Sequence, residues 1–301
     1  MKVKRIPSSG ETVLGTGYRV DFGGKGSNQA VGCARLGARV AFVARIGKDS
    51  FGDMALGLYR DEGIDVASVI QTSKAPTGVG FIVVEEGTGH NCIVLDPGAN
   101  ELLTAEDVVA SHAALESASV VLTQLEISAE AAGAALAAGR RAGAVTILNP
   151  APVRPLPASV FRLINVLTPN ETEARVLAGH SPDAAIDPGS VAQELIARGV
   201  KQVVMTLGEK GAMLVTASSC THVPAVKVQA SDTTGAGDAF NAGLATALAH
   251  GASLEESVRF AAIVGGMAVT KEGVIPSLPR RDEVIEFCRL HGVTAPGWLM
   301  A

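Results

Sequence analysis

A run of small residues followed by an acid has the residue types of an anion-binding turn with a base beside it. Gly235, Ala236 and Gly237 precede Asp238, and an Ala-rich apolar run then continues to His250. A loop without bulky side chains that leads into a helix presents backbone N–H groups to an anion, and the helix dipole adds partial positive charge. A carboxylate there can accept a proton from a substrate hydroxyl. The spacing indicates a phosphoryl-transfer site, although an ordinary helix start with an acid in its first turn explains this stretch alone almost as well.

A second glycine-rich loop, residues 21–30, carries side chains suited to a polyol. Gly23 and Gly24 let the backbone approach a ligand closely, and Lys25 and Asn28 fall in the first turn of the helix expected to follow. Long or amide-bearing side chains at this place can donate hydrogen bonds to hydroxyl groups. A cation at a helix N-terminus opposes the helix dipole, which favours a functional reason for Lys25. A solvated loop lysine is the alternative.

Three polar loops follow predicted strands. They are residues 124–126, 149–152 and 168–173. Because ligands of parallel α/β sheets bind beyond the carboxyl ends of the strands, we expect these loops to line the site. Asn170 and Glu173 are three residues apart and share one face of a helix. On the residues alone, Glu126 is equally well explained as a surface acid, and Asn170 as the start of a helix.

The elements that must position these loops alternate between strand and helix. Apolar runs predict strands at residues 40–46, 120–125, 145–148, 166–168, 203–207 and 212–216. Helical spacing predicts helices at residues 51–61, 129–142, 171–178, 191–198, 238–250, 254–270 and 281–291. Gly265 and Gly266 inside one of these helices imply close packing against a neighbour. Repeated strand–helix pairs favour a parallel sheet covered by helices on both faces.

Two groups of strands break this alternation. Residues 12–20 alternate enough to be a strand, and strands at residues 79–85 and 92–95 flank a hairpin turn at residues 86–90. We interpret residues 1–22 and 74–99 as a small β-sheet lid, and residues 23–73 and 100–292 as the α/β core. The apolar face of such a sheet needs a partner, which predicts a homodimer through the lid. Residues 293–301 are expected to form a dispensable tail.

Composition excludes several classes of function. The chain has 301 residues and a net charge of −5, and its Lys and Arg residues are scattered, so we expect no nucleic-acid or membrane partner. Four cysteines lie far apart without zinc-site spacing, and the six histidines form no ligand pattern. The cysteines are most simply buried thiols of a cytoplasmic protein that acts on small molecules.

Together, the two glycine-rich stretches resemble the two signatures of the PfkB family of carbohydrate kinases. Residues 21–30, Asp-Phe-Gly-Gly-Lys-Gly-Ser-Asn-Gln-Ala, are similar to the first signature, in the form typical of the ribokinase subfamily. Residues 232–241, Asp-Thr-Thr-Gly-Ala-Gly-Asp-Ala-Phe-Asn, are similar to the second, and residues 125–126, 168–173 and 223–228 match in the same order. The resemblance implies a ribokinase-like three-layer α/β/α fold with a mostly parallel central sheet. It also implies ATP-dependent phosphorylation of the primary hydroxyl of D-ribose to ribose 5-phosphate.

The resemblance implies a role for each candidate residue. Asp238 would be the base, and Gly235, Ala236 and Gly237 would hold the transferring phosphoryl group. Contacts to the sugar are implied for Gly24, Lys25, Asn28, Glu126 and Asp238. Contacts to ATP are implied for Asn170, Glu173, Thr206 and Gly208, with Glu173 reaching Mg²⁺ through water. A monovalent cation site, usually holding K⁺, is implied for Asp232, Thr234, Val269, Glu272, Val274 and Ser277.

One part of the family pattern is missing. Members ordinarily begin with an apolar strand of Gly-Ser-x-Asn-x-Asp type whose Asp grips the sugar, and this chain starts after it. We therefore expect unpaired backbone groups on the neighbouring strands. Loss of one charge-assisted contact, about 2–3 kcal/mol, would weaken sugar binding about 30- to 150-fold. The alternatives are a PfkB kinase for another sugar or nucleoside, and a catalytically impaired sugar- or nucleotide-binding protein.

Overall fold

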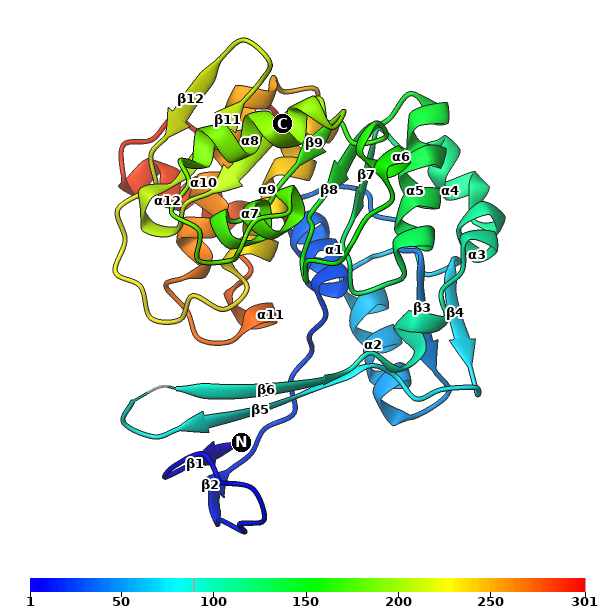
Figure 1. Cartoon of the computed structure of the whole chain (residues 1–301), viewed down its shortest axis with the longest axis vertical. Helices are drawn as coiled ribbons and strands as arrows, with labels where there is room; N and C mark the ends of the chain where they lie inside the picture. The colour runs from blue at the N-terminus through cyan, green and yellow to red at the C-terminus, as the bar shows by residue number, and fades with distance from the viewer. Residues whose placement is uncertain (89, 301) are drawn as a thin grey trace.

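The central layer of the molecule is a six-stranded sheet, as Figure 1 shows for the computed structural model, which describes residues 1–88 and 90–300. Its strand order is β12-β11-β10-β9-β8-β7. The strands are β7 (Val120–Thr123), β8 (Val145–Leu148), β9 (Val166–Leu167), β10 (Gln202–Thr206), β11 (Ala212–Val215) and β12 (Cys220–Val223). Strands β7 to β10 run parallel, and β11 and β12 are antiparallel additions. The predicted mostly parallel sheet is thus confirmed, although the short, partly polar strand β12 was not predicted.

Both faces of this sheet are buried, because alternate residues of each strand point to opposite helix layers. Ile147 and Val204 belong to one core, whereas their neighbours Leu148 and Val203 belong to the other. The first core is covered by α1 (Lys25–Arg35), α9 (Ala236–Ala249) and α10 (Leu254–Ala268). The second is covered by α5 (Ala129–Ala142), α7 (Glu171–Ala178) and α8 (Pro188–Ala197). The result is the three-layer α/β/α sandwich.

Glycines let the helices of the first layer approach closely. A Cβ added to Gly32 of α1 would lie 2.6 Å from the Ala242 Cβ of α9. A Cβ on Gly265 of α10 would lie 3.3 Å from the backbone oxygen of Ala236, so the close packing expected for Gly265 is confirmed. Helix α1 is therefore pressed against the helix that carries Asp238.

A second, two-stranded sheet stands apart from the main one. It pairs β3 (Ala44–Gly47) in parallel with β4 (Val69–Thr72), and α2 (Ser50–Asp61) connects the two strands. The strand predicted for residues 40–46 therefore begins later than expected, and β4 was not predicted. In the described part of the chain, β7 ends the six-stranded sheet and β3 pairs with β4 alone. Each of these two sheets therefore ends in an open strand edge.

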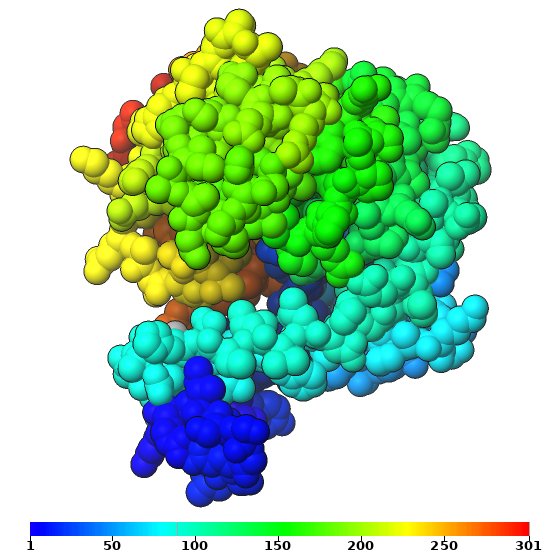
Figure 2. Space-filling view, viewed as in Figure 1, coloured from blue at the N-terminus to red at the C-terminus, as the bar shows by residue number. Residues whose placement is uncertain are grey.

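The third sheet is the four-stranded unit that we call the lid sheet, with the order β2-β1-β5-β6. Its strands are β1 (Lys2–Val3), β2 (Gly15–Gly17), β5 (Val79–Glu85) and β6 (Asn91–Asp96). The hairpin strands are close to those predicted, whereas the strand expected at residues 12–20 is wrong in extent, because only Gly15–Gly17 pairs with a neighbour. Gly89, in the predicted turn, lies outside the described residues. Figure 2 shows a hollow between the lid sheet and the α/β core.

The base of the lid sheet is fixed by a half-buried turn. The Asp49 carboxylate, which caps α2, accepts hydrogen bonds from Thr77 N at 2.7 Å and from Thr77 Oγ1 at 2.8 Å. These hydrogen bonds, with a further one from Gly52 N, hold the pKa of Asp49 below its usual value. Thr77 directly precedes Gly78 and β5, so the lid hairpin is anchored to the segment that carries the small sheet.

Short helices complete the fold. They are η1 (Gly98–Leu102), α3 (Ala105–Ala110), α4 (His112–Glu116), α6 (Ala158–Phe161), η2 (Gly208–Lys210), α11 (Val274–Ser277), α12 (Arg281–Leu290) and α13 (Gly297–Met300). The expected tail packs on the core: Leu299 is buried, and Trp298 stacks on His250 with ring centroids 4.7 Å apart. Ala301, at its end, lies outside the described residues. Cys33 and Cys288 are buried as expected, but Cys92 and Cys220 are exposed.

Of the helices in the described ranges, none combines the length and apolar character needed to cross a bilayer.

Candidate active site

The start of α1 brings the sugar-loop residues to Glu126. Gly24 precedes the helix with φ of 90°, a conformation that side chains rarely adopt, and Lys25 N donates to Glu126 Oε2 at 2.7 Å. Burial raises the pKa of Glu126, and the hydrogen bond and charge of Lys25 oppose the rise. Glu126 is therefore a partly buried carboxylate at the helix N-terminus and not a free surface acid.

Asp238 lies in the first turn of α9 and is buried. Its Oδ2 accepts from Asn28 Nδ2 at 2.8 Å, and its Oδ1 accepts from Gln29 Nε2, also at 2.8 Å. Asn28 Oδ1 is buried and has no partner among residues 1–88 and 90–300. A buried acceptor without a partner is costly unless a ligand supplies a donor. A substrate hydroxyl beside Asp238 fits this atom.

The turn before Asp238 has the geometry of an anion site. Gly235 has φ of 82°, and a Cβ there would lie 2.6 Å from Val274 Cγ1, so a glycine is required. Ala236 N donates to Thr233 O at 3.3 Å. The amides of Gly235 and Gly237 have no acceptor in the described part of the chain. Two free N–H groups at a helix N-terminus are suited to a phosphoryl group.

The predicted nucleotide residues gather at the end of β10. Asn170 and Glu173 form a reciprocal capping box on α7, with Glu173 N to Asn170 Oδ1 at 2.8 Å and Asn170 N to Glu173 Oε2 at 2.9 Å. Thr206 pairs with Asn170 in an isolated parallel β-bridge, and Gly208, two residues after Thr206, begins η2. Burial raises the pKa of Glu173; the charge of Lys25 lowers it, and that of Asp238 adds to the rise. Asn170 thus does start a helix. The carboxylate of Glu173 is influenced by the charges of Lys25 and Asp238, which also act on Glu126.

The residues of the predicted cation site form one cluster of loops. Asp232 accepts from Thr234 N at 2.9 Å and from Gly273 N at 3.1 Å, and Ser231 N donates to Val269 O at 2.7 Å. Burial acts to raise the pKa of Asp232, but the hydrogen bonds from Thr234 and Gly273, with the charge of Arg19, hold it below its usual value.

The same loops supply further oxygens. Ser277 Oγ donates to Val274 O at 2.8 Å, and Glu272 is exposed at the edge of the cluster. A carboxylate, a hydroxyl and backbone carbonyls make an oxygen-only donor set, which suits a hard cation.

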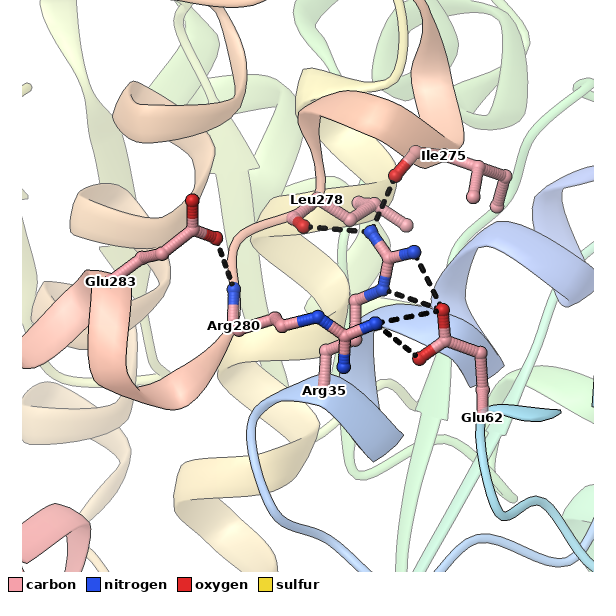
Figure 3. Close-up of polar contacts among 6 residues, drawn as sticks. All are labelled: Arg35, Glu62, Ile275, Leu278, Arg280 and Glu283. Atoms are coloured by element: carbon pink, nitrogen blue, oxygen red, sulfur yellow. Dashed lines mark hydrogen bonds and ion pairs between the residues drawn. The ribbon is translucent and has the colours of Figure 1, made fainter.

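A half-buried arginine ties α1 to α11 and to the residue that follows it. Arg35 Nη1 donates to the carbonyls of Ile275 at 2.6 Å and Leu278 at 3.0 Å, while its other nitrogens bind Glu62 (Figure 3). Arg280 adds a second, longer contact to Glu62. One end of α1 therefore carries the sugar loop, and the other holds the chain beside the cation cluster.

Three polar residues of the site were not predicted. Gln29, Gln124 and Asn149 form a buried amide chain behind Asp238. Gln124 and Asn149 begin two of the polar loops flagged in the sequence, and Gln29 directly follows Asn28. Their position in those loops was the available signal, but residue type alone does not reveal which amides meet.

A fold of this kind, with a buried carboxylate beside a free helix N-terminus, defines a small-molecule kinase of the three-layer α/β class. The sequence matches the pfkB family carbohydrate kinase over residues 1–281. It is 39% identical over 290 residues to the ribokinase of Haemophilus influenzae, across 95% of this chain and 94% of that relative. The chain therefore belongs to the PfkB family of carbohydrate kinases, and the expected membership is confirmed.

Solved structures are similar as well. The crystal structure of ribokinase from Thermotoga maritima matches with a TM-score of 0.87 and 36% identity, over 96% of this chain and 94% of that one. The structure of Arabidopsis thaliana ribokinase complexed with ribose and ATP matches with a TM-score of 0.86 and 32% identity, over 95% and 93% of the two chains. These matches confirm the ribokinase-like fold.

Proposed function

We propose that this protein transfers the γ-phosphoryl group of ATP to the primary hydroxyl of D-ribose, giving ribose 5-phosphate. The proposal is supported by the similarity to ribokinases, one of them complexed with ribose and ATP. The observation that carries it is the buried Asp238 carboxylate, which is bound by Asn28 and follows Gly235 and Gly237; Asn28 Oδ1 and the amides of the two glycines have no partner among residues 1–88 and 90–300. A sugar at that place would have a carboxylate to take the proton of the attacking hydroxyl, and Asn28 Oδ1 to accept from another hydroxyl.

In the proposed reaction, Asp238 removes the proton of the sugar hydroxyl. The hydroxyl oxygen then forms a bond to the γ-phosphorus, and the bond from this phosphorus to the β,γ-bridging oxygen breaks, which releases ADP. The amides of Gly235 and Gly237, aided by Ala236 and the N-terminus of α9, stabilise the negative charge on the transferring group. Gly24, Lys25 and Glu126 orient the sugar.

We assign the nucleotide to the opposite side of Asp238. Asn170, Glu173, Thr206 and Gly208 would contact ATP, and Glu173 would hold Mg²⁺ through water. The metal supplies charge neutralisation on the phosphates when bound. We assign K⁺ to the oxygen cluster of Asp232, Thr234, Val269, Glu272, Val274 and Ser277, supported by its oxygen-only donor set.

The test is an ADP-release assay with ribose, fructose and adenosine as separate acceptors, in KCl and in tetramethylammonium chloride. We expect turnover with ribose and a higher rate in KCl. Asp238→Asn is expected to lower kcat by about 10²- to 10⁴-fold and to leave ATP affinity within about twofold, because the general base is lost. Asp183→Asn, a change of the same kind on an exposed surface, serves as the control.

Other results would overturn the proposal in different ways. Turnover with adenosine alone would make the protein a nucleoside kinase. Binding of ATP and ribose without transfer would make it an impaired binding protein. If Asp238→Asn retained turnover, Asp238 would not be the base.

We further propose that residues 1–22 and 74–99 act as a lid over the sugar, and that two lids pair in a homodimer. Support comes from the hollow beneath the lid sheet and from the exposed apolar residues of β5 and β6 (Figure 2). Phe81 is 64% exposed and its cross-strand partner Val94 is 60% exposed, which is unfavourable without a partner surface. A cytoplasmic location is proposed from the use of ATP.

A further inference from the structure

Gln29 is a buried amide whose three hydrogen bonds reach three different elements. It lies in α1 and is 1% exposed. Its Nε2 donates to Asp238 Oδ1 of α9 at 2.8 Å and to Asn149 Oδ1, after β8, at 3.1 Å. Its Oε1 accepts from Gln124 Nε2, after β7. Both hydrogens on Gln29 Nε2 are thereby used, so its amide is fixed on both sides.

The direction of this amide is set by its neighbours. Asn149 Nδ2 donates to Thr168 O at 3.0 Å, which leaves Asn149 Oδ1 to face Gln29 as an acceptor. A flipped Gln29 would present its oxygen to two acceptors, Asn149 Oδ1 and Asp238 Oδ1, and its nitrogen to the donor Gln124 Nε2. Two repulsive contacts between oxygens would replace two hydrogen bonds, whereas the Gln124 amide, which has no other side-chain hydrogen bond among the described residues, could turn to accept from the flipped nitrogen. The donor therefore always points at Asp238.

Gln29 differs from its neighbour Asn28 in what it leaves free. Asn28 also donates to Asp238, but its Oδ1 has no partner among the described residues and is available to substrate. Gln29 has no such atom, because its oxygen and both hydrogens are engaged. Its contribution to the reaction is thus made through Asp238.

The hydrogen bond from Gln29 to Asp238 lies among several charged side chains. The charges of Asp238 and of Lys25 both act on the carboxylates of Glu126 and Glu173. Burial raises the pKa of Glu126 and of Glu173, and the charge of Asp238 adds to both rises. Among these charged groups, the donor on Oδ1 keeps the Asp238 carboxylate in one orientation.

We propose that Gln29 is a positioning residue that holds the Asp238 carboxylate oriented toward the sugar hydroxyl. The inference rests on the proposed role of Asp238 as the base. No substrate contact is assigned to Gln29.

Gln29→Glu tests the proposal with almost unchanged side-chain volume. The new carboxylate would lie at hydrogen-bond distance from Asp238 Oδ1, so the two acids would share a proton near neutral pH. Because the base must be deprotonated, the acid limb of the pH profile of kcat is expected to move upward by about one pH unit or more. At pH 7, kcat is expected to fall by about 30-fold or more, with the KM for ATP within about twofold. Gln71→Glu is the matched control, since Gln71, outside the site, also donates to an aspartate, Asp53, at 3.3 Å.

The pH profile separates positioning from simple structural support. A merely structural role predicts an equal loss of kcat at every pH, with the acid limb in place, and that result would overturn the proposal. If Asp238→Asn abolishes turnover while Gln29→Glu behaves as wild type, the kinase proposal stands and this inference fails. If Gln29→Glu does not fold, Gln124→Leu frees the Gln29 amide without replacing it. A kcat for Gln124→Leu equal to wild type would contradict the proposal, and a loss of about threefold or more would support it.

Discussion

Glu126 is a single residue in which ligand binding and stability oppose each other. Its carboxylate accepts the Lys25 amide at the start of α1, yet burial raises its pKa. A carboxyl group with a raised pKa in the folded state favours folding most when protonated. Above the pKa of the unfolded state, its ionisation therefore costs stability, and the cost is complete above the folded-state pKa.

Glu126→Gln is therefore expected to raise the melting temperature at pH 8 while weakening ribose binding. The amide oxygen can still accept from Lys25 N, but the buried charge is gone. Below about pH 4, where glutamate is protonated in both states, the two melting temperatures should converge. The KM for ribose is expected to rise by about tenfold or more, since a charge-assisted contact is lost. Thermal melts at both pH values check the first effect, with exposed Glu106→Gln as the control; a lower melting temperature at pH 8 would contradict it.

Residue types predicted most of the candidate site but not its internal contacts. The signature loops contain Asp238, Lys25 and Asn28, and the structure brings the amide of Asn28 to Asp238. The pairing of Gln29 with Asn149 depends on two chain segments 120 residues apart. A buried amide next to a functional one has no distinguishing pattern, so such contacts emerge only when the segments pack.

At the scale of elements, α1 is held at both ends. Its N-terminus meets Glu126, and near its C-terminus Arg35 binds Glu62 and the carbonyls before α12 (Figure 3). Burial acts to raise the pKa of Glu62, but Arg35 and Arg280 outweigh it and hold the pKa below its usual value. Removing one partner of a buried pair leaves the other charge uncompensated.

Glu62→Gln is expected to lower the free energy of unfolding at pH 7 by about 1.5–3 kcal/mol. A lowered folded-state pKa gives stability above the unfolded pKa of glutamate, near 4.3, and this stability is lost as pH falls through the folded pKa. The difference between variant and wild type should therefore shrink in acid. Urea unfolding at pH 7 and pH 3 measures it. Glu255→Gln breaks an exposed pair with Arg259 and should cost less than about 1 kcal/mol; an equal effect in both variants would refute the argument.

Elements with strong periodicity were predictable, and those fixed by distant partners were not. The helix at Ala129–Ala142 has the predicted bounds because a Ser128 cap, an apolar stripe and Gly143 define it locally. Strand β1, in contrast, is two residues long and forms between β2 and β5. Nothing in residues 2–3 favours a strand until those partners are in place.

At the scale of the molecule, the lid sheet presents apolar side chains on both faces. Phe81 lies opposite Val94 on one face, and Ile82 lies opposite Ile93 on the other. All four are more than 40% exposed in the single chain. One face is available to cover the sugar, which leaves the other for a second copy.

Phe81→Asp and Ile93→Asp place a charge on opposite faces of the lid sheet. We expect wild type to have twice the chain mass by light scattering, and one of the two variants to be monomeric, because a buried unpaired charge opposes association. The face that responds identifies the interface. Surface-exposed Val109→Asp, on α3, is the control. A monomeric wild type, or two variants that both remain dimeric, would exclude pairing through these faces.

The open strand edges at β7 and β3 affect how cooperatively the molecule unfolds. Within residues 1–88 and 90–300, no strand pairing crosses from the six-stranded sheet to β3 and β4, and the Asp49–Thr77 contacts fasten the lid hairpin to the smaller unit. Side chains of that unit, among them Ile46 and Tyr59, belong to the first core, and Glu62 pairs with Arg35, so packing and an ion pair hold the unit to the core. The cooperativity of unfolding between this unit and the main sheet therefore depends on side-chain packing and ion pairs and not on backbone ladders.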